Sequence, residues 1–224
     1  MAVTDDASSA LAIIPAWVDV SAVALGSVLG SLAAARARYD INGALVVGVA
    51  TGLGGGMIRD ALLNTGLPLA LTSPWLLPTA VVAALVTFLF SRQLHLVHGR
   101  VGRIVVVLDA VFLAEYTIVG VERGFAAGLP FVSVVFVGIV TGVGGGILRD
   151  LLLHRSPVVL NPGTLEAAAS LLGAIAQTAA AFLIGQAWAL LVGFVVIVGL
   201  RLCSVFLGWE TRPARIDETP PGVA

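Results

Sequence analysis

The chain has 224 residues, of which 58% are hydrophobic and 11% are charged, and its mean hydropathy is +1.05. These values lie far from those of a soluble domain and indicate an integral membrane protein. The formal net charge is −1, so bulk electrostatics predict no nucleic-acid partner. All twelve fixed positive charges are arginines, which excludes Schiff-base chemistry on a lysine.

Seven apolar segments predict an all-α membrane fold of seven transmembrane helices. A bilayer core about 30 Å thick requires about 20 residues of helix, and charged or Pro-rich breaks separate seven runs of this kind. The residues before them include two acids and no basic region, so we expect no cleaved signal peptide. The stretch 210–224 has mixed charge and no apolar face, and it is expected to be a disordered tail. We place the helices over residues 12–35, 41–64, 75–92, 103–123, 129–153, 164–184 and 187–207.

A decapeptide occurs twice, ninety residues apart: TGLGGGMIRD from Thr51 to Asp60 and TGVGGGILRD from Thr141 to Asp150. Asp19 and Asp109 keep the same offset, so the repeat extends beyond the motif. Each copy contains three predicted helices, and an odd number inserts the second copy upside down, as an inverted repeat. Within a single membrane domain, 1–224, we assign residues 12–92 to repeat one, 103–184 to repeat two and 187–207 to a seventh helix.

The glycine triplets predict interruptions of the second and fifth helices. Each glycine lowers helix stability by about 1 kcal/mol, and an adjacent Arg-Asp pair is costly at membrane depth. In inverted repeats, such breaks meet near the bilayer midplane, where an ion or solute is held. The alternative is that the glycines only permit close helix packing. The predicted break residues are Gly54, Gly55, Gly56, Gly144, Gly145 and Gly146.

Charged residues at similar predicted depths suggest two buried clusters. Asp19 and Arg59 lie on the order of 10 Å below the outer surface, counted at 1.5 Å per residue, and we expect them to pair. Asp109 and Arg149 stand in the same relation near the inner surface. A purely structural salt bridge is an equally good interpretation, because burial forces pairing in either case.

Three further acids and one arginine complete the candidate residues. Asp60 and Asp150 adjoin the two arginines, and we expect them to face a second partner or water. Glu115 falls near the middle of the fourth span and is a candidate pore or gating residue. Arg123 lies near the outer end of that span.

Arginine counting predicts the orientation. The loops after the first, third and fifth spans and the C-terminal tail hold most of the loop arginines, and such loops stay cytoplasmic. We therefore expect a multi-pass protein of the cell membrane with its N-terminus outside and its C-terminus in the cytoplasm.

The chain resembles prokaryotic members of the trimeric intracellular cation (TRIC) channel family, whose repeats carry the glycine-transporter-domain name. The resemblance covers about residues 15 to 205, and it depends on Asp19, GSLAAARARYD from Gly30, TGLGGGMIRDALL, LDA with Asp109, Gly120 and TGVGGGILRDLLL. It implies a homotrimer in membrane lipid, with an hourglass pore in each protomer for monovalent cations, chiefly potassium. It also implies kinks at both glycine triplets and pore-lining roles for Thr51 and Thr141. The family often has lysine at Arg123, where a basic residue is linked to gating or lipid contact.

The residues leave a second function open, a secondary transporter of glycine or a similar small zwitterion, because it too requires broken helices and paired charges. We do not expect an enzyme, since the sequence contains no nucleophile–base pair and no metal constellation. We expect no cofactor.

Overall fold

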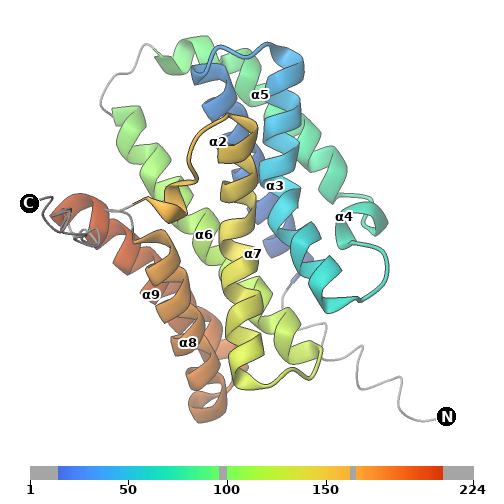
Figure 1. The fold of residues 1–224 in the computed structure, drawn as a ribbon, viewed down its shortest axis with the longest axis vertical. Helices are drawn as coiled ribbons and strands as arrows, with labels where there is room; N and C mark the ends of the chain where they lie inside the picture. Colours follow the sequence, from blue (N-terminus) through green and yellow to red (C-terminus); the bar gives the residue numbers. More distant parts are fainter. Residues whose placement is uncertain (1–14, 96–99, 162–164, 209–224) are drawn as a thin grey trace, which may run out of the picture.

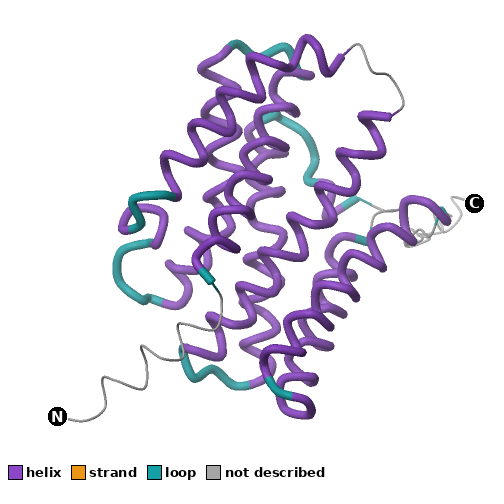
Figure 2. Tube along the Cα trace, turned by 180° about the vertical axis from the view of Figure 1, so that it is seen from behind, coloured by secondary structure: helices purple, strands orange, loops and turns teal. Residues whose placement is uncertain are grey.

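The computed structural model describes residues 15–95, 100–161 and 165–208, and within these ranges the chain is helical with no strand (Figure 2). Two short elements follow the second and fifth long helices: α4 (Leu69–Thr72) and the 3-10 helix η1 (Val158–Leu160). The predicted tail, 210–224, lies outside the described residues. The seven long helices of the described part are α2 (Ala16–Arg36), α3 (Ile41–Leu63), α5 (Leu76–His95), α6 (Arg100–Ala126), α7 (Phe131–Leu152), α8 (Glu166–Ile184) and α9 (Gln186–Leu207).

Local chemistry sets the ends of the helices. At the start of α3, the Asp40 carboxylate accepts a hydrogen bond of 2.9 Å from the Gly43 amide, as an N-cap does. The same helix ends at Asn64, whose left-handed conformation (φ 50°) stops further helical hydrogen bonding. In α7, Pro130 precedes the first turn, where its missing N–H costs nothing.

The helices have the length and polarity that a bilayer requires. Six of the described helices are long and apolar enough to cross a membrane, and α5 contributes a shorter apolar stretch, Leu76–Ser91. Large apolar side chains cover the outer surface: Leu183 is 82% exposed and Val132 is 77% exposed. Such a surface suits lipid rather than water. The predicted all-α membrane fold is confirmed.

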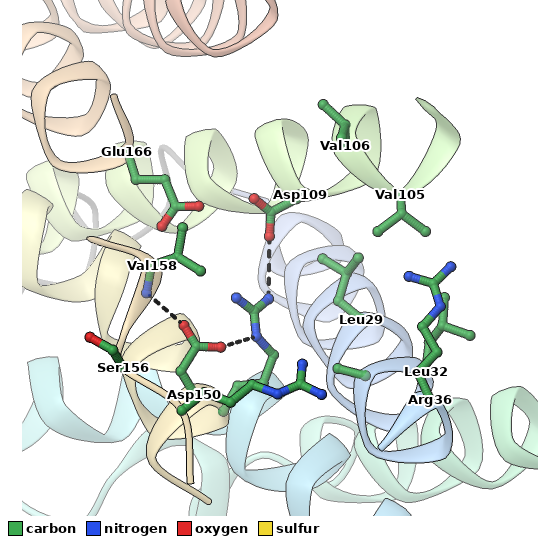
Figure 3. A pocket seen from close by; sticks show the side chains of 13 residues that line it. Leu29, Leu32, Arg36, Val105, Val106, Asp109, Asp150, Ser156, Val158 and Glu166 are labelled. Atoms are coloured by element: carbon green, nitrogen blue, oxygen red, sulfur yellow. Dashed lines mark hydrogen bonds and ion pairs between the residues drawn. The ribbon is translucent and has the colours of Figure 1, made fainter. Parts of the chain in front are cut away.

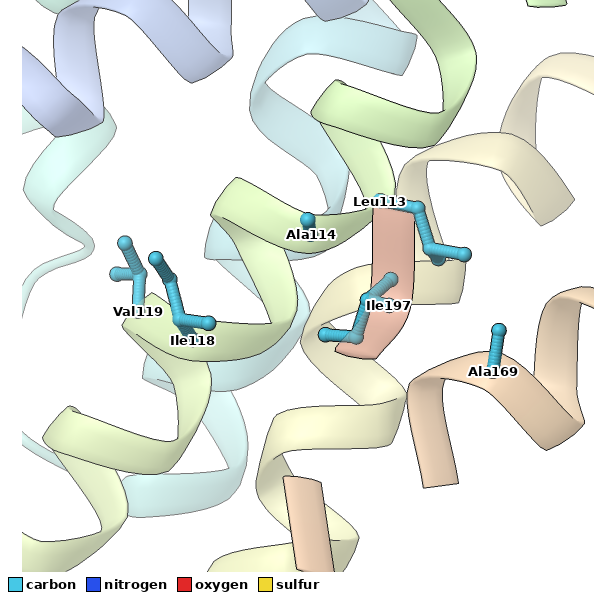
Figure 4. Close-up of a cluster of buried hydrophobic side chains, with 6 residues drawn as sticks. All are labelled: Leu113, Ala114, Ile118, Val119, Ala169 and Ile197. Carbon is cyan, nitrogen blue, oxygen red and sulfur yellow. The ribbon is translucent and has the colours of Figure 1, made fainter. Parts of the chain in front are cut away.

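The long helices form two groups that meet at a central pair. Helix α2 packs against α3 and α5, while α6 packs against α7 and α8. Between the groups, α3 and α7 run antiparallel and cross in the centre of the molecule (Figure 1). Helix α9 packs mainly on α8 and α6. Its Ile197 lies in a buried cluster with Leu113 and Ile118 of α6 and Ala169 of α8 (Figure 4).

Candidate functional site

The two glycine triplets form the contact between α3 and α7. A methyl group added at Gly55 would collide with the carbonyl oxygen of Thr141, and one added at Gly145 would collide with the carbonyl oxygen of Thr51. A methyl at Gly144 would lie 3.2 Å from Cα of Gly55. The two helices therefore touch backbone to backbone, in a reciprocal arrangement that follows the inverted repeat.

The predicted interruption of helical structure is wrong. Both α3 and α7 remain α-helical through their triplets, from Ile41 to Leu63 and from Phe131 to Leu152. An unpaired backbone group costs several kcal/mol in an apolar interior, so the chain keeps its helical hydrogen bonds there. The glycines instead allow the two helices to pack closely, which stabilises helix pairs in membranes. A bend within the continuous helices stays a prediction.

Thr51 and Thr141 are fully buried and bond within their own helices. Each hydroxyl donates to the carbonyl oxygen four residues earlier, at 2.6 Å, on Val47 and Val137 respectively. Neither side chain lines the pockets described below, so the pore-lining role stays a prediction for another conformation. At the crossing of α3 and α7, Thr51 and Thr141 present their backbone carbonyl oxygens to Gly145 and Gly55.

The first charged group, which we call the Arg59 site, consists of Asp19, Arg59, Asp60 and Arg123. Arg59 is 3% exposed, and its Nη2 lies 2.7 Å from Oδ1 of Asp60. The other carboxylate oxygen of Asp60 accepts a 2.8 Å bond from the Leu69 amide, which ties the loop before α4 to α3. Asp19 lies 3.2 Å from Nη2 of Arg123.

The predicted Asp19–Arg59 pair is therefore wrong. The Leu69 amide fixes the Asp60 carboxylate on the loop side of α3, and the long Arg59 side chain folds back to meet it. Asp19 is left to bind Arg123 across the contact between α2 and α6. Asp60 was expected to point away from Arg59, and this is wrong for the same reason. The expected second partner of Asp60 is present and is the backbone amide of Leu69.

The second charged group, the Arg149 site, is drawn in Figure 3 and repeats this geometry at the other end of the antiparallel α3–α7 pair. Arg149 Nε donates to Asp150 at 3.0 Å, and the second oxygen of Asp150 accepts from the Val158 amide at 2.9 Å. The predicted Asp109–Arg149 pair is present, at 3.4 Å. Val158 begins η1, so each site ties down the short element that follows its helix.

Helix α9 contributes a residue to the Arg149 site to which the sequence analysis gave no role. Arg201 Nη2 lies 2.8 Å from Asp109 and 2.7 Å from Glu166, the first residue of α8. Arg201 is 6% exposed. An arginine in an otherwise apolar last helix requires a partner from another helix, and that signal was present in the sequence.

Pockets open beside both sites. A pocket of about 270 Å³ at the Arg149 site is lined by Arg36, Asp109, Arg149 and Leu29, among others, and has room for several waters (Figure 3). At the Arg59 site, a cavity of about 20 Å³ has room for a single water and reaches Gly56 and Tyr116.

A third pocket of about 350 Å³ also opens at the Arg59 site. It is lined by Arg59, Asp60, Arg123 and the chain from Leu63 to Thr72. Both charged sites therefore lie beside space that can hold water.

One buried side-chain cluster reaches from one charged site to the other. Leu29, which lines the 270 Å³ pocket, belongs to the same buried cluster as Phe112 and Tyr116, and Tyr116 lines the cavity at the Arg59 site. The two rings lie 5.0 Å apart. The Tyr116 hydroxyl donates to the carbonyl oxygen of Gly52 beside the crossing. We call Leu29, Phe112 and Tyr116 the aromatic layer, and neither ring was predicted from the sequence as part of the site.

Two acids of α6 lie apart from both charged sites. Glu115 accepts a 3.2 Å bond from the Ser21 hydroxyl, and its other carboxylate oxygen is buried without a partner. Glu122 is 7% exposed and accepts from Gln177 at 3.1 Å. Glu115 does not line the pockets described here, so its gating role stays a prediction.

These features define a polytopic membrane protein in which two halves of opposite orientation each carry one Arg-Asp site and meet at a glycine crossing. The sequence matches the family described as Glycine transporter over residues 16–92 and 106–183. The chain belongs to this family, the TRIC family that its motifs resemble.

Relatives and solved structures of this family cover most of the chain. The UPF0126 inner membrane protein YadS of Escherichia coli is 35% identical over 90% of this chain and 97% of its own length. YvgT, a UPF0126 membrane protein of Bacillus subtilis, is 32% identical over 85% and 93%. The TRIC trimeric intracellular cation channel orthologue of Rhodobacter sphaeroides superposes with a TM-score of 0.79 at 34% identity, over 86% of this chain and 97% of that one. Another solved structure, described as the structural basis for conductance through TRIC cation channels, superposes with a TM-score of 0.80 at 28% identity, over 92% of this chain and 100% of that one.

Proposed function

We propose that the protein is a channel for monovalent cations, chiefly potassium, with one pathway through each protomer of a homotrimer. The observation that carries the proposal is the pair of buried charged sites, each beside a pocket, at opposite ends of the antiparallel α3–α7 pair. Similarity to solved structures described as TRIC cation channels, one of them as trimeric, supports a cation channel and a trimer.

We infer that this conformation is closed to ions, because Leu29 of the pocket at the Arg149 site and Tyr116 of the cavity at the Arg59 site belong to one packed cluster beside the tight glycine crossing. Opening requires α3 and α7 to separate at the crossing and Tyr116 to release Gly52. Membrane interiors tolerate exposed backbone where it lines a water-filled cavity, so such a separation must admit water.

Separation of the helices, together with a local loosening of their helical hydrogen bonds, would expose oxygen ligands suited to a cation. The carbonyl oxygens of Thr51 and Thr141 are now covered by Gly145 and Gly55, and they would face the gap. Rings of carbonyl oxygen replace the hydration shell of an ion in other channels. A pathway with several weak sites of this kind permits fast release, which flux requires.

We propose that the Arg149 site lies on the cytoplasmic side of the cell membrane and the N-terminus outside, as the distribution of loop arginines favours. Two of these loop arginines, Arg36 and Arg155, line the pocket at this end. Relatives named as inner membrane proteins support the location.

A second function, transport of glycine or a similar zwitterion, is favoured by the description of the family. Each site offers a guanidinium for a carboxylate and a carboxylate for an ammonium group. A transporter would expose the two sites alternately, whereas a channel opens to both sides at once.

Reconstitution separates the two functions. Purified protein in planar bilayers with a potassium gradient is expected to give unitary currents in the absence of any organic solute. The same protein in liposomes is expected to show no saturable counterflow of labelled glycine. Saturable counterflow without unitary current would contradict the channel.

A further inference from the structure

We propose that Arg201 acts as a built-in cation: its guanidinium occupies the Asp109–Glu166 carboxylate pair, which would otherwise bind a permeant cation at the Arg149 site. The proposal deepens the channel function above and depends on it only for its electrical consequences. One nitrogen of Arg201 contacts both acids, at 2.8 and 2.7 Å. A single positive centre between two carboxylates is the arrangement that a bound metal cation would adopt.

The two sites differ in charge, and Arg201 reduces the difference. The Arg59 site holds two carboxylates and two arginines. The Arg149 site holds three carboxylates, from Asp109, Asp150 and Glu166, against Arg149 and Arg201. Without Arg201, the buried ion-pair cluster would hold one arginine against three acids, while the exposed Arg36 and Arg155 of the same pocket are screened by solvent, so the cluster would attract cations.

Arg201 comes from outside the repeated unit. Helix α9 packs mainly on α8 and α6, and the glycine crossing is made by α3 and α7. Loss or displacement of the Arg201 side chain can therefore change the charge of the site without altering the crossing. Arg36 and Arg155, which are exposed, line the same pocket and belong to other parts of the chain.

Burial makes the effect of the charge large. Arg201 is 6% exposed, and the side chains of Asp109 and Glu166 are 19% and 13% exposed. Removing one partner of a buried pair leaves an uncompensated charge, which a proton or a cation from solution must neutralise. Carboxylate oxygens are the ligands that Ca²⁺ prefers, so calcium is a sensitive probe of the vacated pair.

The first test measures thermal unfolding of full-length protein in detergent against calcium chloride concentration, at fixed ionic strength. For Arg201→Gln, we expect Tm to rise by about 3 to 5 °C per tenfold increase of calcium above its Kd. Wild type and Arg123→Gln, the matched variant at the Arg59 site, are expected to show no such rise. The double variant Glu166→Gln/Arg201→Gln retains fewer carboxylates and is expected to lose the calcium dependence. A Tm of Arg201→Gln that does not respond to calcium would overturn the proposal.

The second test measures unitary potassium current with low salt on the Arg149 side. Arg201→Gln is expected to raise the current entering from that side at least twofold and to make it sensitive to block by calcium from that side alone. Glu166→Gln leaves Arg201 in place with one acid fewer, so it is expected to lower the same current. Because Glu166→Gln is expected to change the current in the opposite direction, it tests the proposal even if Arg201→Gln does not fold. An unchanged current in Glu166→Gln would overturn the proposal.

The two tests separate failure of this inference from failure of the channel. Absence of potassium current in wild type contradicts the channel, while the calcium dependence of Tm still tests Arg201. Normal wild-type current together with an unchanged Arg201→Gln contradicts only the role of Arg201. A purely structural ion pair would lower the Tm of Arg201→Gln without calcium rescue and without a change on one side of the membrane.

Discussion

The reciprocal glycine contact predicts that Gly55→Ala destabilises the protein although alanine favours helices. The new methyl group would meet the carbonyl oxygen of Thr141, a backbone atom that cannot turn aside. Overpacking of this kind costs about 1 to 3 kcal/mol. Alanine returns about 0.5 to 1 kcal/mol of helix preference over glycine. The net loss is centred on about 1 kcal/mol, which lowers Tm by about 2 to 4 °C for a chain of this length.

The third glycine of each triplet provides the matched control. A methyl group at Gly56 would lie 3.8 Å from Nη2 of Arg59, and one at Gly146 would lie 3.9 Å from Nη2 of Arg149. Both are ordinary van der Waals contacts, so Gly56→Ala and Gly146→Ala are expected to leave Tm unchanged or to raise it by a few degrees.

The assay is thermal unfolding of purified variants in one detergent, followed by fluorescence or by loss of the monodisperse peak. Gly145→Ala, which meets the carbonyl oxygen of Thr51, is expected to behave like Gly55→Ala. Equal shifts at Gly55 and Gly56, or a higher Tm for Gly55→Ala, would refute the backbone contact between α3 and α7.

Three further changes test the charged sites and the aromatic layer. Tyr116→Phe removes the hydrogen bond to Gly52, which is worth about 0.5 to 1.5 kcal/mol, and is expected to raise open probability in bilayers; an unchanged open probability would count against Tyr116 as part of the closed gate. Asp60→Asn leaves buried Arg59 without its anion and is expected to cost about 3 to 5 kcal/mol, seen as loss of folded protein on size-exclusion chromatography. Exchanging Asp19→Arg with Arg123→Asp is expected to recover more folded protein than either single change, and failure to do so would contradict their pairing.

Hydropathy and internal repetition were sufficient to predict the architecture. Apolar runs of bilayer length have one stable solution in lipid, a helix, so the spans were placed within a few residues of α2 to α9. The doubled motif predicted the opposed halves. The Asp109–Arg149 pair was also predictable, because depth along two antiparallel helices follows from residue counting.

The sequence could not predict which acid pairs with Arg59 or whether the helices continue through the glycine triplets. Arg59 had two acids within reach, and the Leu69 amide decided the outcome in favour of Asp60. Glycine propensity suggested a break, but propensity is about 1 kcal/mol per residue, whereas lost backbone hydrogen bonds in an apolar interior cost several. Arg201 was missed because its acids come from helices distant in sequence.

The most direct test of the pathway is single-channel recording of the purified wild type and Phe112→Ala in symmetrical potassium. Phe112 fills the layer between the two pockets, and a methyl in place of its ring opens that layer. The expected result is unitary current in both proteins, with a higher open probability in Phe112→Ala and the same preference for potassium. Silence from both proteins, with labelled glycine exchanging across the same membranes, would contradict a pathway through the protomer.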